Sequence, residues 1–284
     1  MAGSFHQRLL TATRYALIEQ GRNRFALGLL LIFVPFWFYF IGVLIPADAV
    51  DFKFWVTGAL LHVNGQNLSY LSAGLNALTL IVGFMFFAST HKGISFDRRL
   101  VLSSYPQALL ILGKLIALAL VTALISLYAS AMLFFFWHPG HPTSLALVWL
   151  GFWSAALIYG GFGLLLGVLV TNELAGFFLI IMLSLFDTLL QNPVDNPLGN
   201  QPILKEFPAF GPMQLDVAGG FTNVVPWAYF GLSLLWFAGF ALLGLAIFWW
   251  RTRARSVQVM PPERAATVSS GSAPLDLSGS GKIS

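Results

Sequence analysis

The sequence predicts an all-α polytopic membrane protein with six transmembrane helices, an N-terminal interfacial helix and both termini in the cytoplasm. Of the 284 residues, 57% are hydrophobic and only 9% are charged, whereas about 25% are charged in a typical soluble domain. The 15 lysines and arginines gather in alternate polar segments, as they do on the cytoplasmic side of membrane proteins. The chain has no cysteine, which excludes disulfides, thiolate metal sites and cysteine nucleophiles.

The first element is a predicted amphipathic helix over residues 4–25. Ser4 and Gln7 have the spacing of a capping box. Apolar residues recur at helical spacing, while arginines occupy another face. The apolar face comprises Phe5, Leu9, Ala12 and Ala16. A basic amphipathic helix ahead of a first span typically lies in the membrane interface; the alternative is a solvated basic leader that only orients the chain.

A membrane-spanning domain is expected over residues 26–250. A helix needs about 20 apolar residues to cross a bilayer. Six stretches of this kind lie at roughly 26–45, 69–89, 107–137, 145–170, 174–192 and 227–250. Only the segment VTNEL separates the fourth stretch from the fifth, which predicts a tight helical hairpin with Glu173 in its turn.

The distribution of positive charge predicts the orientation. The N-terminal segment, the 90–106 loop and the tail carry nearly all lysines and arginines, whereas the alternate loops carry only Lys53 and Lys205. Because cytoplasmic loops are enriched in these residues, both termini and the 90–106 loop are expected in the cytoplasm. The serine-, glycine- and proline-rich residues 256–284 are expected to form a disordered tail.

The cytoplasmic loop THKGISFDRRLVLSSYP interrupts the apolar chain between the second and third stretches. One interpretation is a passive turn with orienting charges. The other is a short amphipathic helix over about residues 94–105, with Phe96 and Leu100 on one face. Asp97 would lie in its first turn, where the helix dipole favours a carboxylate. Pro106 disfavours helix in the residue before it and suits the first turn of the next helix.

Residues 73–115 resemble the core signature of the type 2 ATP-binding-cassette (ABC) transporter permeases. In that family a span ends in a charged residue and a glycine, followed by a coupling helix, a Ser/Pro turn and a span that opens with Gly-Lys. The matching positions are Lys92-Gly93, Asp97 to Leu100, Ser104 to Pro106 and Gly113-Lys114. The chain departs from the family in having His91-Lys92 where an acidic residue often precedes the glycine. Together with the N-terminal helix and the six stretches, the resemblance covers about residues 4–255.

The resemblance implies the membrane subunit of an ATP-driven exporter in the bacterial cytoplasmic (inner) membrane. Such a subunit moves an amphipathic or hydrophobic small molecule, a lipid or a glycan outward by alternating access. Its expected partners are an ABC ATPase, a second permease subunit in a homo- or heterodimer, and membrane lipid, with no nucleic acid. The residues expected to couple to the ATPase are Phe96, Asp97, Arg98, Arg99, Leu100 and Glu173.

ATP and magnesium are expected on the partner ATPase and not on this chain. The C-terminal SGSGKIS looks like part of a phosphate loop, but Asp276 stands where the first glycine is needed and Ile283 where a Ser or Thr is needed. No catalytic constellation stands out, so the chain is not expected to be an enzyme. A metal site is not expected either, because His138 and His141 have no third ligand close in sequence.

Several residues inside the apolar stretches are candidates for packing or transport. Gly160, Gly163 and Gly167 include a small-xxx-small spacing that lets membrane helices pack closely, either within the subunit or at a dimer contact. Lys114 and Asp187 are candidate pathway or gating residues, because charges inside spans are often functional. The alternatives are that Lys114 snorkels to the cytoplasmic interface and that Asp187 reaches the outer one.

The proline-rich residues 193–226 are too long for a plain connector. Family resemblance implies short re-entrant helices, and the alternative is a loose outer loop. Three other functions remain open: a secondary transporter driven by an ion gradient, an intramembrane enzyme, and a membrane scaffold without transport activity. The first would need intramembrane acids and an internal repeat, and the second a paired constellation of acid, histidine or serine.

Overall fold

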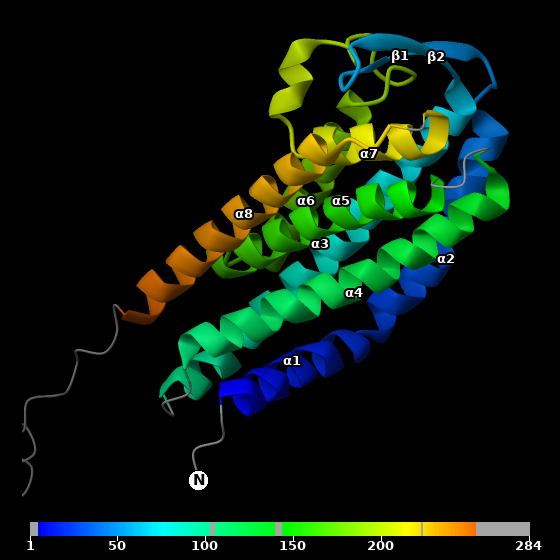
Figure 1. Ribbon diagram of the computed structural model, residues 1–284. Coiled ribbons are helices and arrows are strands. Elements are labelled where there is room, and N and C mark those ends of the chain that lie inside the picture. Colours follow the sequence, from blue (N-terminus) through cyan, green and yellow to red (C-terminus); the bar gives the residue numbers. More distant parts are fainter. Residues whose placement is uncertain (1–4, 103–105, 140–143, 223, 254–284) are drawn as a thin grey trace, which may run out of the picture. The chain divides into compact units, whose positions relative to one another are not determined.

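The computed structural model of the chain describes residues 5–102, 106–139, 144–222 and 224–253, which are mostly helical (Figure 1). In chain order the elements are α1 (Phe5–Gly21), α2 (Arg24–Leu44), β1 (Ala49–Phe54), β2 (Ala59–Asn64), α3 (Gly65–Leu102), α4 (Gln107–Phe136), α5 (Ser144–Leu169), α6 (Glu173–Leu190), the 3-10 helix η1 (Pro202–Glu206), α7 (Phe210–Phe221) and α8 (Trp227–Arg253). One compact unit ends at Phe248, and a second unit begins at Trp249. The expected tail, residues 256–284, lies outside the described residues.

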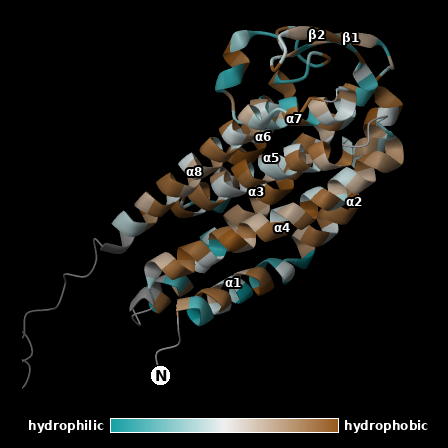
Figure 2. Ribbon diagram, in the orientation of Figure 1, coloured by the Kyte–Doolittle hydropathy of each residue, from teal (hydrophilic) through white to brown (hydrophobic). Residues whose placement is uncertain are grey.

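Six helices are long and apolar enough to cross a membrane, which confirms the expected multi-pass architecture. The candidate spans are Arg24–Leu44, Gly65–Ile94, Ala108–Phe136, Ser144–Leu169, Glu173–Leu190 and Trp227–Trp250. Figure 2 shows hydrophobic residues along these helices and more hydrophilic ones on α1. The placement of both termini in the cytoplasm stays a prediction.

Helices α3 and α5 form the inside of the bundle. In each of them 83% of an 18-residue apolar stretch is buried inside the structure, compared with 17% in α2 and 11% in α8. Glycines allow the two backbones to approach closely: a Cβ atom at Gly163 would lie 2.4 Å from the Gly83 carbonyl oxygen. Because neither backbone can move away without disturbing its other neighbours, α3 and α5 are expected to move together.

Helix α3 is longer than expected. The sequence predicts a separate short helix over about residues 94–105, but α3 continues without a break to Leu102. A glycine within a helix costs only about 1 kcal/mol relative to alanine, so Gly93 does not end it, and the buried Asp97 side chain holds the extension against α4. Residues 103–105 lie outside the described part of the chain. Pro106 directly precedes α4, as its position in the sequence predicts.

The all-α prediction omits one element, the antiparallel hairpin of β1 and β2. Phe52 and Phe54 are buried, whereas Asp51 on the other face is exposed. This alternation is the ordinary signal of a half-buried strand. Gly58 in the connection has a φ of +72°, which glycine adopts without steric strain.

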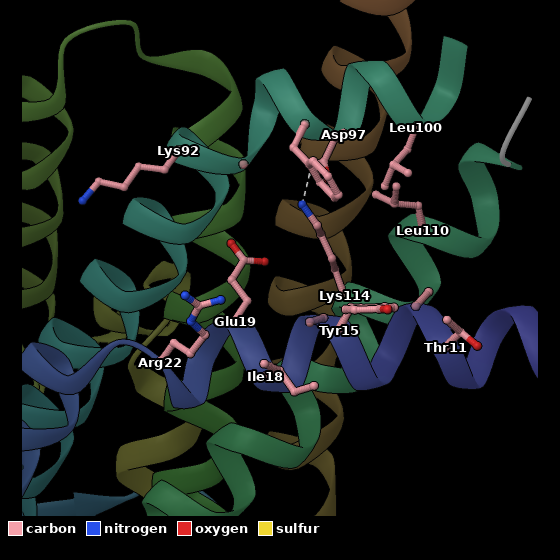
Figure 3. A pocket seen from close by; sticks show the side chains of 14 residues that line it. Thr11, Tyr15, Ile18, Glu19, Arg22, Lys92, Asp97, Leu100, Leu110 and Lys114 are labelled. Atoms are coloured by element: carbon pink, nitrogen blue, oxygen red, sulfur yellow. Dashed lines mark hydrogen bonds and ion pairs between the residues drawn. The ribbon is translucent and has the colours of Figure 1, made fainter. Parts of the chain in front are cut away.

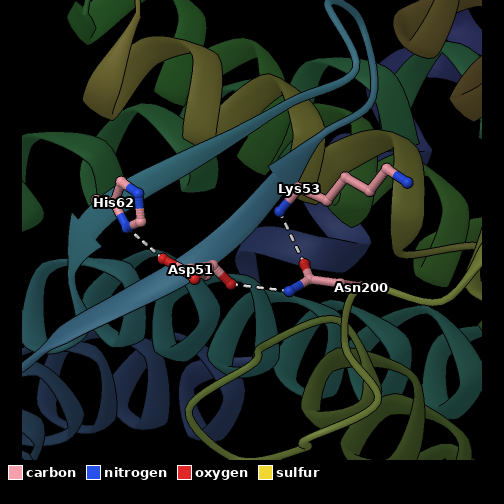
Figure 4. Close-up of polar contacts among 4 residues, drawn as sticks. All are labelled: Asp51, Lys53, His62 and Asn200. Carbon is pink, nitrogen blue, oxygen red and sulfur yellow. Dashed lines mark hydrogen bonds and ion pairs between the residues drawn. The ribbon is translucent and has the colours of Figure 1, made fainter.

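The proline-rich segment 193–226 folds against this hairpin. Asn200 bridges to β1, because its Oδ1 accepts a hydrogen bond from the Lys53 N–H (2.7 Å) and its Nδ2 donates to the Asp51 carbonyl oxygen (2.8 Å; Figure 4). The N–H of Trp55 donates to Gln214 Oε1 on α7 (3.0 Å). All residues of α7 from Phe210 to Gly220 are buried. These contacts favour a folded cap over a loose loop, and insertion of the segment into the membrane stays a prediction.

Candidate functional site

A cavity of about 700 Å³ lies between α1, the C-terminal part of α3 and the start of α4 (Figure 3). Its walls combine apolar and charged side chains. The charged ones are Glu19, Arg22, Lys92, Asp97 and Lys114. The cavity therefore lies beside the segment that the sequence assigns to partner coupling.

An ion pair between Asp97 and Lys114 forms part of the cavity wall, and the Lys114 Nζ donates to Asp97 Oδ2 (dashed line in Figure 3). The Asp97 side chain is nearly buried and the Lys114 side chain is partly buried. A carboxylate removed from water needs a compensating partner, so the two groups stabilise each other. The sequence assigns Asp97 to partner contact and Lys114 to the pathway; both roles stay predictions, and the structure joins the two side chains across the α3–α4 connection.

Gly93 lies where the charged groups of this wall converge. A Cβ atom at this position would lie 3.7 Å from both Glu19 Oε1 and Lys114 Nζ, and 3.9 Å from Asp97 Oδ2. These are ordinary contact distances, so the position tolerates a small side chain. Glycine thus leaves the space in which the side chains from α1, α3 and α4 meet.

Helix α1 is attached to both α3 and α4. A Cβ atom at Gly113 would lie 2.8 Å from the Ala12 Cβ, so α1 and α4 approach each other with little side chain between them. Ser89 on α3 donates a hydrogen bond to Glu19 Oε1 (2.7 Å). Ala16 is buried, whereas Phe5 is exposed. Only part of the expected apolar face therefore packs against the bundle.

Glu173 lies at the start of α6, close to the same region. Its Oε1 is 3.8 Å from the Lys92 Nζ, and both side chains are largely exposed. Asn172 caps the helix by accepting a hydrogen bond from the Leu174 N–H (3.0 Å). An exposed ion pair of this kind contributes at most about 1 kcal/mol, but it places the α5–α6 turn beside α3.

The other candidate coupling residues differ in exposure. Phe96 is 63% exposed, and Arg99 is exposed as well. Leu100 is half-buried and lines the cavity with Leu110. The Arg98 side chain lies outside the described part of the structure. Phe96 is therefore the apolar group best placed for contact with another protein, since exposed aromatics often anchor interfaces.

The three candidate packing glycines of α5 face neighbouring helices of the same chain. A Cβ atom at Gly160 would lie 2.8 Å from Leu118 Cδ1 on α4, and one at Gly167 would lie 2.7 Å from Thr90 Cβ on α3. Gly163 meets the backbone of α3, as described above. These contacts favour packing within the subunit over a dimer contact.

Asp187, the second candidate pathway residue, is buried near the C-terminal end of α6. Its Oδ2 accepts hydrogen bonds from the Tyr159 hydroxyl (2.8 Å) and from the Ala209 N–H (2.8 Å). The carboxylate thus ties α6 to α5 and to the start of α7. It does not reach the Asp97–Lys114 pair, because it belongs to the opposite end of the membrane domain, next to the proline-rich cap.

Sequence reasoning missed a buried acid, Asp216 on α7. Neither carboxylate oxygen has a hydrogen-bond partner among the described residues, and complete burial raises the pKa of Asp216 well above its usual range. The signal was a single acid within the apolar run PMQLDVAGG. Glu19 was also missed as a contact, because only the fold brings it to Ser89.

Metal ligands do not gather in the part of the chain that the structure describes: no three His, Cys, Asp or Glu side chains there form a cluster. His141 lies outside that part. Comparison of the sequence with protein-family models and with curated proteins found no match. The function is therefore inferred from the geometry of the chain itself.

Proposed function

We propose that this chain is the membrane subunit of an ATP-driven exporter and that the end of α3 receives movement from a separate ABC ATPase. The observation that carries the proposal is the continuity of α3. The candidate span in this helix ends at Ile94, but the helix continues to Leu102. The same helix packs at the centre of the bundle, so one unbroken helix connects the exposed Phe96 to the core.

The C-terminal part of α3, from Ser89 to Asp97, contacts three other helices, which suits a part that transmits force. Asp97 pairs with Lys114 on α4, Ser89 bonds to Glu19 on α1, and Lys92 lies near Glu173 on α6. A displacement of this end would be passed to α1 and α4 and, through the Gly83–Gly163 contact, to α5. Packed helices respond to such shifts as rigid bodies rather than by continuous deformation.

Contact with the ATPase would rest on Phe96 as an anchor, next to the positive charges that Arg98 and Arg99 add in the sequence. Buried aromatic groups dominate interface energy, and charges at the rim mainly steer association. ATP and its magnesium ion would bind the ATPase alone. Differential binding of ATP to two conformations of that partner would drive alternating access here.

The outer helices leave room for a second permease subunit and for lipid. In an 18-residue apolar stretch of each of these helices, the buried share of residues is 17% in α2, 28% in α6 and 11% in α8. Two copies or two related chains would enclose a pathway for an amphipathic or hydrophobic small molecule, a lipid or a glycan. The bacterial cytoplasmic membrane is the proposed location.

An exporter driven by an ion gradient is the second candidate. It is favoured by the buried acid Asp187 in the candidate span of α6, whose Oδ1 has no partner among the described residues, since intramembrane acids often carry protons. The two candidates differ in their energy source. Dissipating the proton gradient at constant ATP would stop export only in the second case.

The test uses the tagged full-length chain, purified in mild detergent from membranes of its own host. We expect wild type to co-purify with a subunit that gives vanadate-sensitive ATP hydrolysis. Phe96→Ala should lower the recovered activity by about tenfold or more, as expected for an interface anchor. The matched control is Phe178→Ala on α6, because Phe178 is similarly exposed (59% against 63% for Phe96) but lies on another helix.

Two results would contradict the proposal. Equal recovery of ATPase activity with wild type and with Phe96→Ala would show that the end of α3 is not the contact. Absence of a co-purifying ATPase, together with export that stops when the proton gradient collapses, would favour the second candidate.

A further inference from the structure

A second, smaller cavity, of about 70 Å³, lies beside Asp187 at the C-terminal end of α6. Aromatic rings make up most of its wall and come from α5, α6, the segment before α7, and α8. The lining residues are Tyr159, Phe162, Leu183, Phe186, Asp187, Phe207, Pro208 and Phe240. We call this the aromatic cavity.

The rings of the aromatic cavity form two groups, Tyr159–Phe162–Phe240 and Phe186–Phe207. The Phe162 and Phe240 centroids are 5.2 Å apart, and the Tyr159 and Phe162 centroids are 6.1 Å apart. The Phe186 and Phe207 centroids are 6.4 Å apart. An aromatic face carries negative charge density and attracts cations within about 6 Å of the ring centre. Several such rings around one space suit a positively charged group.

One oxygen of the Asp187 carboxylate in this wall has no hydrogen-bond partner among the described residues. Tyr159 and Ala209 donate hydrogen bonds to Oδ2, whereas Oδ1 has no partner among the described residues and the side chain is 3% exposed. The nearby Gln191 side chain interacts with the Asp187 carboxyl group, and its amide donates a hydrogen bond to the Leu204 carbonyl oxygen (3.3 Å). A purely structural role explains Oδ2, but it leaves a buried oxygen unsatisfied, which is unfavourable.

We propose that the aromatic cavity binds an organic ammonium ion, whose charged nitrogen lies beside Asp187 Oδ1 and whose small substituents contact the rings. The volume admits the head of such a molecule, and any long apolar part would remain outside, along the exposed side chains of α6. An inorganic cation fits poorly, because it prefers several oxygen ligands and this wall consists mainly of carbon. The inference does not rest on the proposed export function, since binding requires neither ATP nor a partner.

Binding is measured with the purified full-length chain in nanodiscs of phosphatidylcholine, without ATP. The probe is radiolabelled octyltrimethylammonium, displaced by the unlabelled cation or by octyl glucoside, a neutral amphiphile with the same chain. We expect saturable binding that the cation displaces at least about tenfold better than the neutral compound does, because one charge-assisted contact and several rings separate the two.

Variants test the two parts of the cavity separately. Asp187→Asn keeps the shape but removes the charge, and it should weaken octyltrimethylammonium binding by about tenfold or more. Phe240→Leu removes one ring and should weaken binding by about two- to fivefold. Phe178→Leu and Asp216→Asn are the controls, because they remove a ring and a buried carboxylate elsewhere, and both should bind as wild type does.

Either of two outcomes would overturn the inference. One is equal displacement by the neutral compound in wild type, which needs no variant to fold. The other is unchanged binding in both Asp187→Asn and Phe240→Leu. If Asp187→Asn fails to fold, the selectivity of wild type and the Phe240→Leu result still decide.

Discussion

The ion pair between Asp97 and Lys114 makes a quantitative prediction about the brace between α3 and α4. Lys114→Met removes the charge while keeping a long apolar side chain, and it leaves the Asp97 carboxylate, with 8% of its side chain exposed, without a partner. Breaking a fully buried pair in this way costs about 3–5 kcal/mol. The Lys114 side chain is 20% exposed and borders an open cavity, so solvent reduces the loss to about 2 kcal/mol of unfolding free energy.

A loss of this size is measurable as a shift in melting temperature. For a chain of this length, about 2 kcal/mol corresponds to a decrease of about 4–8 °C. The 9 tryptophans of the chain allow unfolding to be followed by intrinsic fluorescence in detergent. The matched control is Lys92→Met, which removes a lysine from the exposed contact with Glu173 and should change stability by less than about 0.5 kcal/mol.

A double-mutant cycle separates the pair from its surroundings. Asp97→Asn combined with Lys114→Met leaves no unpaired charge, so the double variant should recover at least about 1 kcal/mol relative to the sum of the single variants. Strictly additive losses would show that the two groups do not stabilise each other. A melting temperature for Lys114→Met equal to that of Lys92→Met would likewise refute the brace.

Three further predictions concern other parts of the bundle and its cap. Gly163→Ala should lower stability by about 1–3 kcal/mol, because its Cβ would lie 2.4 Å from a backbone oxygen, whereas Gly239→Ala, with nothing within 4 Å, should be neutral or slightly stabilising in the same melting assay. Burial raises the pKa of Asp216, so the folded state holds the Asp216 proton more tightly than the unfolded state does. The free energy of unfolding is therefore greatest at low pH and falls as the pH rises above the pKa of the unfolded state. Asp216→Asn should remove this fall in melting experiments recorded between pH 4 and 8. A wild-type profile identical to that of Asp216→Asn would contradict the prediction. Asn200→Ala should cost about 1–3 kcal/mol and increase hydrogen exchange at Lys53, while equal exchange would show that the bridge to the hairpin is weak.

The sequence was sufficient for the parts of the fold that depend on local pattern. About 20 consecutive apolar residues indicate each span. Glu173, between two such stretches, indicates the turn between α5 and α6. Pro106 marked the start of α4 because proline has a fixed effect on its neighbours. These signals are readable because the bilayer imposes the same requirement on every spanning helix.

Other features depend on contacts between distant residues and escaped sequence reasoning. The polar composition of residues 90–106 predicts a loop with a short helix of its own. In the structure α3 continues through this segment, because Asp97 forms an ion pair with Lys114 on α4. The alternation in β1 was present, but a short strand is marginal without the α7 and Asn200 contacts that hold it. The free oxygen of Asp187 is visible only once Tyr159 and Ala209 are seen to occupy the other one.

The Asn200 bridge has a consequence for the biosynthesis of the chain. Asn200 follows its partner Lys53 by 147 residues, and helices α3 to α6 lie between them. At about 5–20 residues per second, the ribosome reaches Asn200 roughly 7–30 s after the hairpin has been made. The hairpin therefore lacks its Asn200 contacts during the time in which the four helices α3 to α6 are synthesised. A nascent chain released before residue 200 lacks the bridge that holds β1.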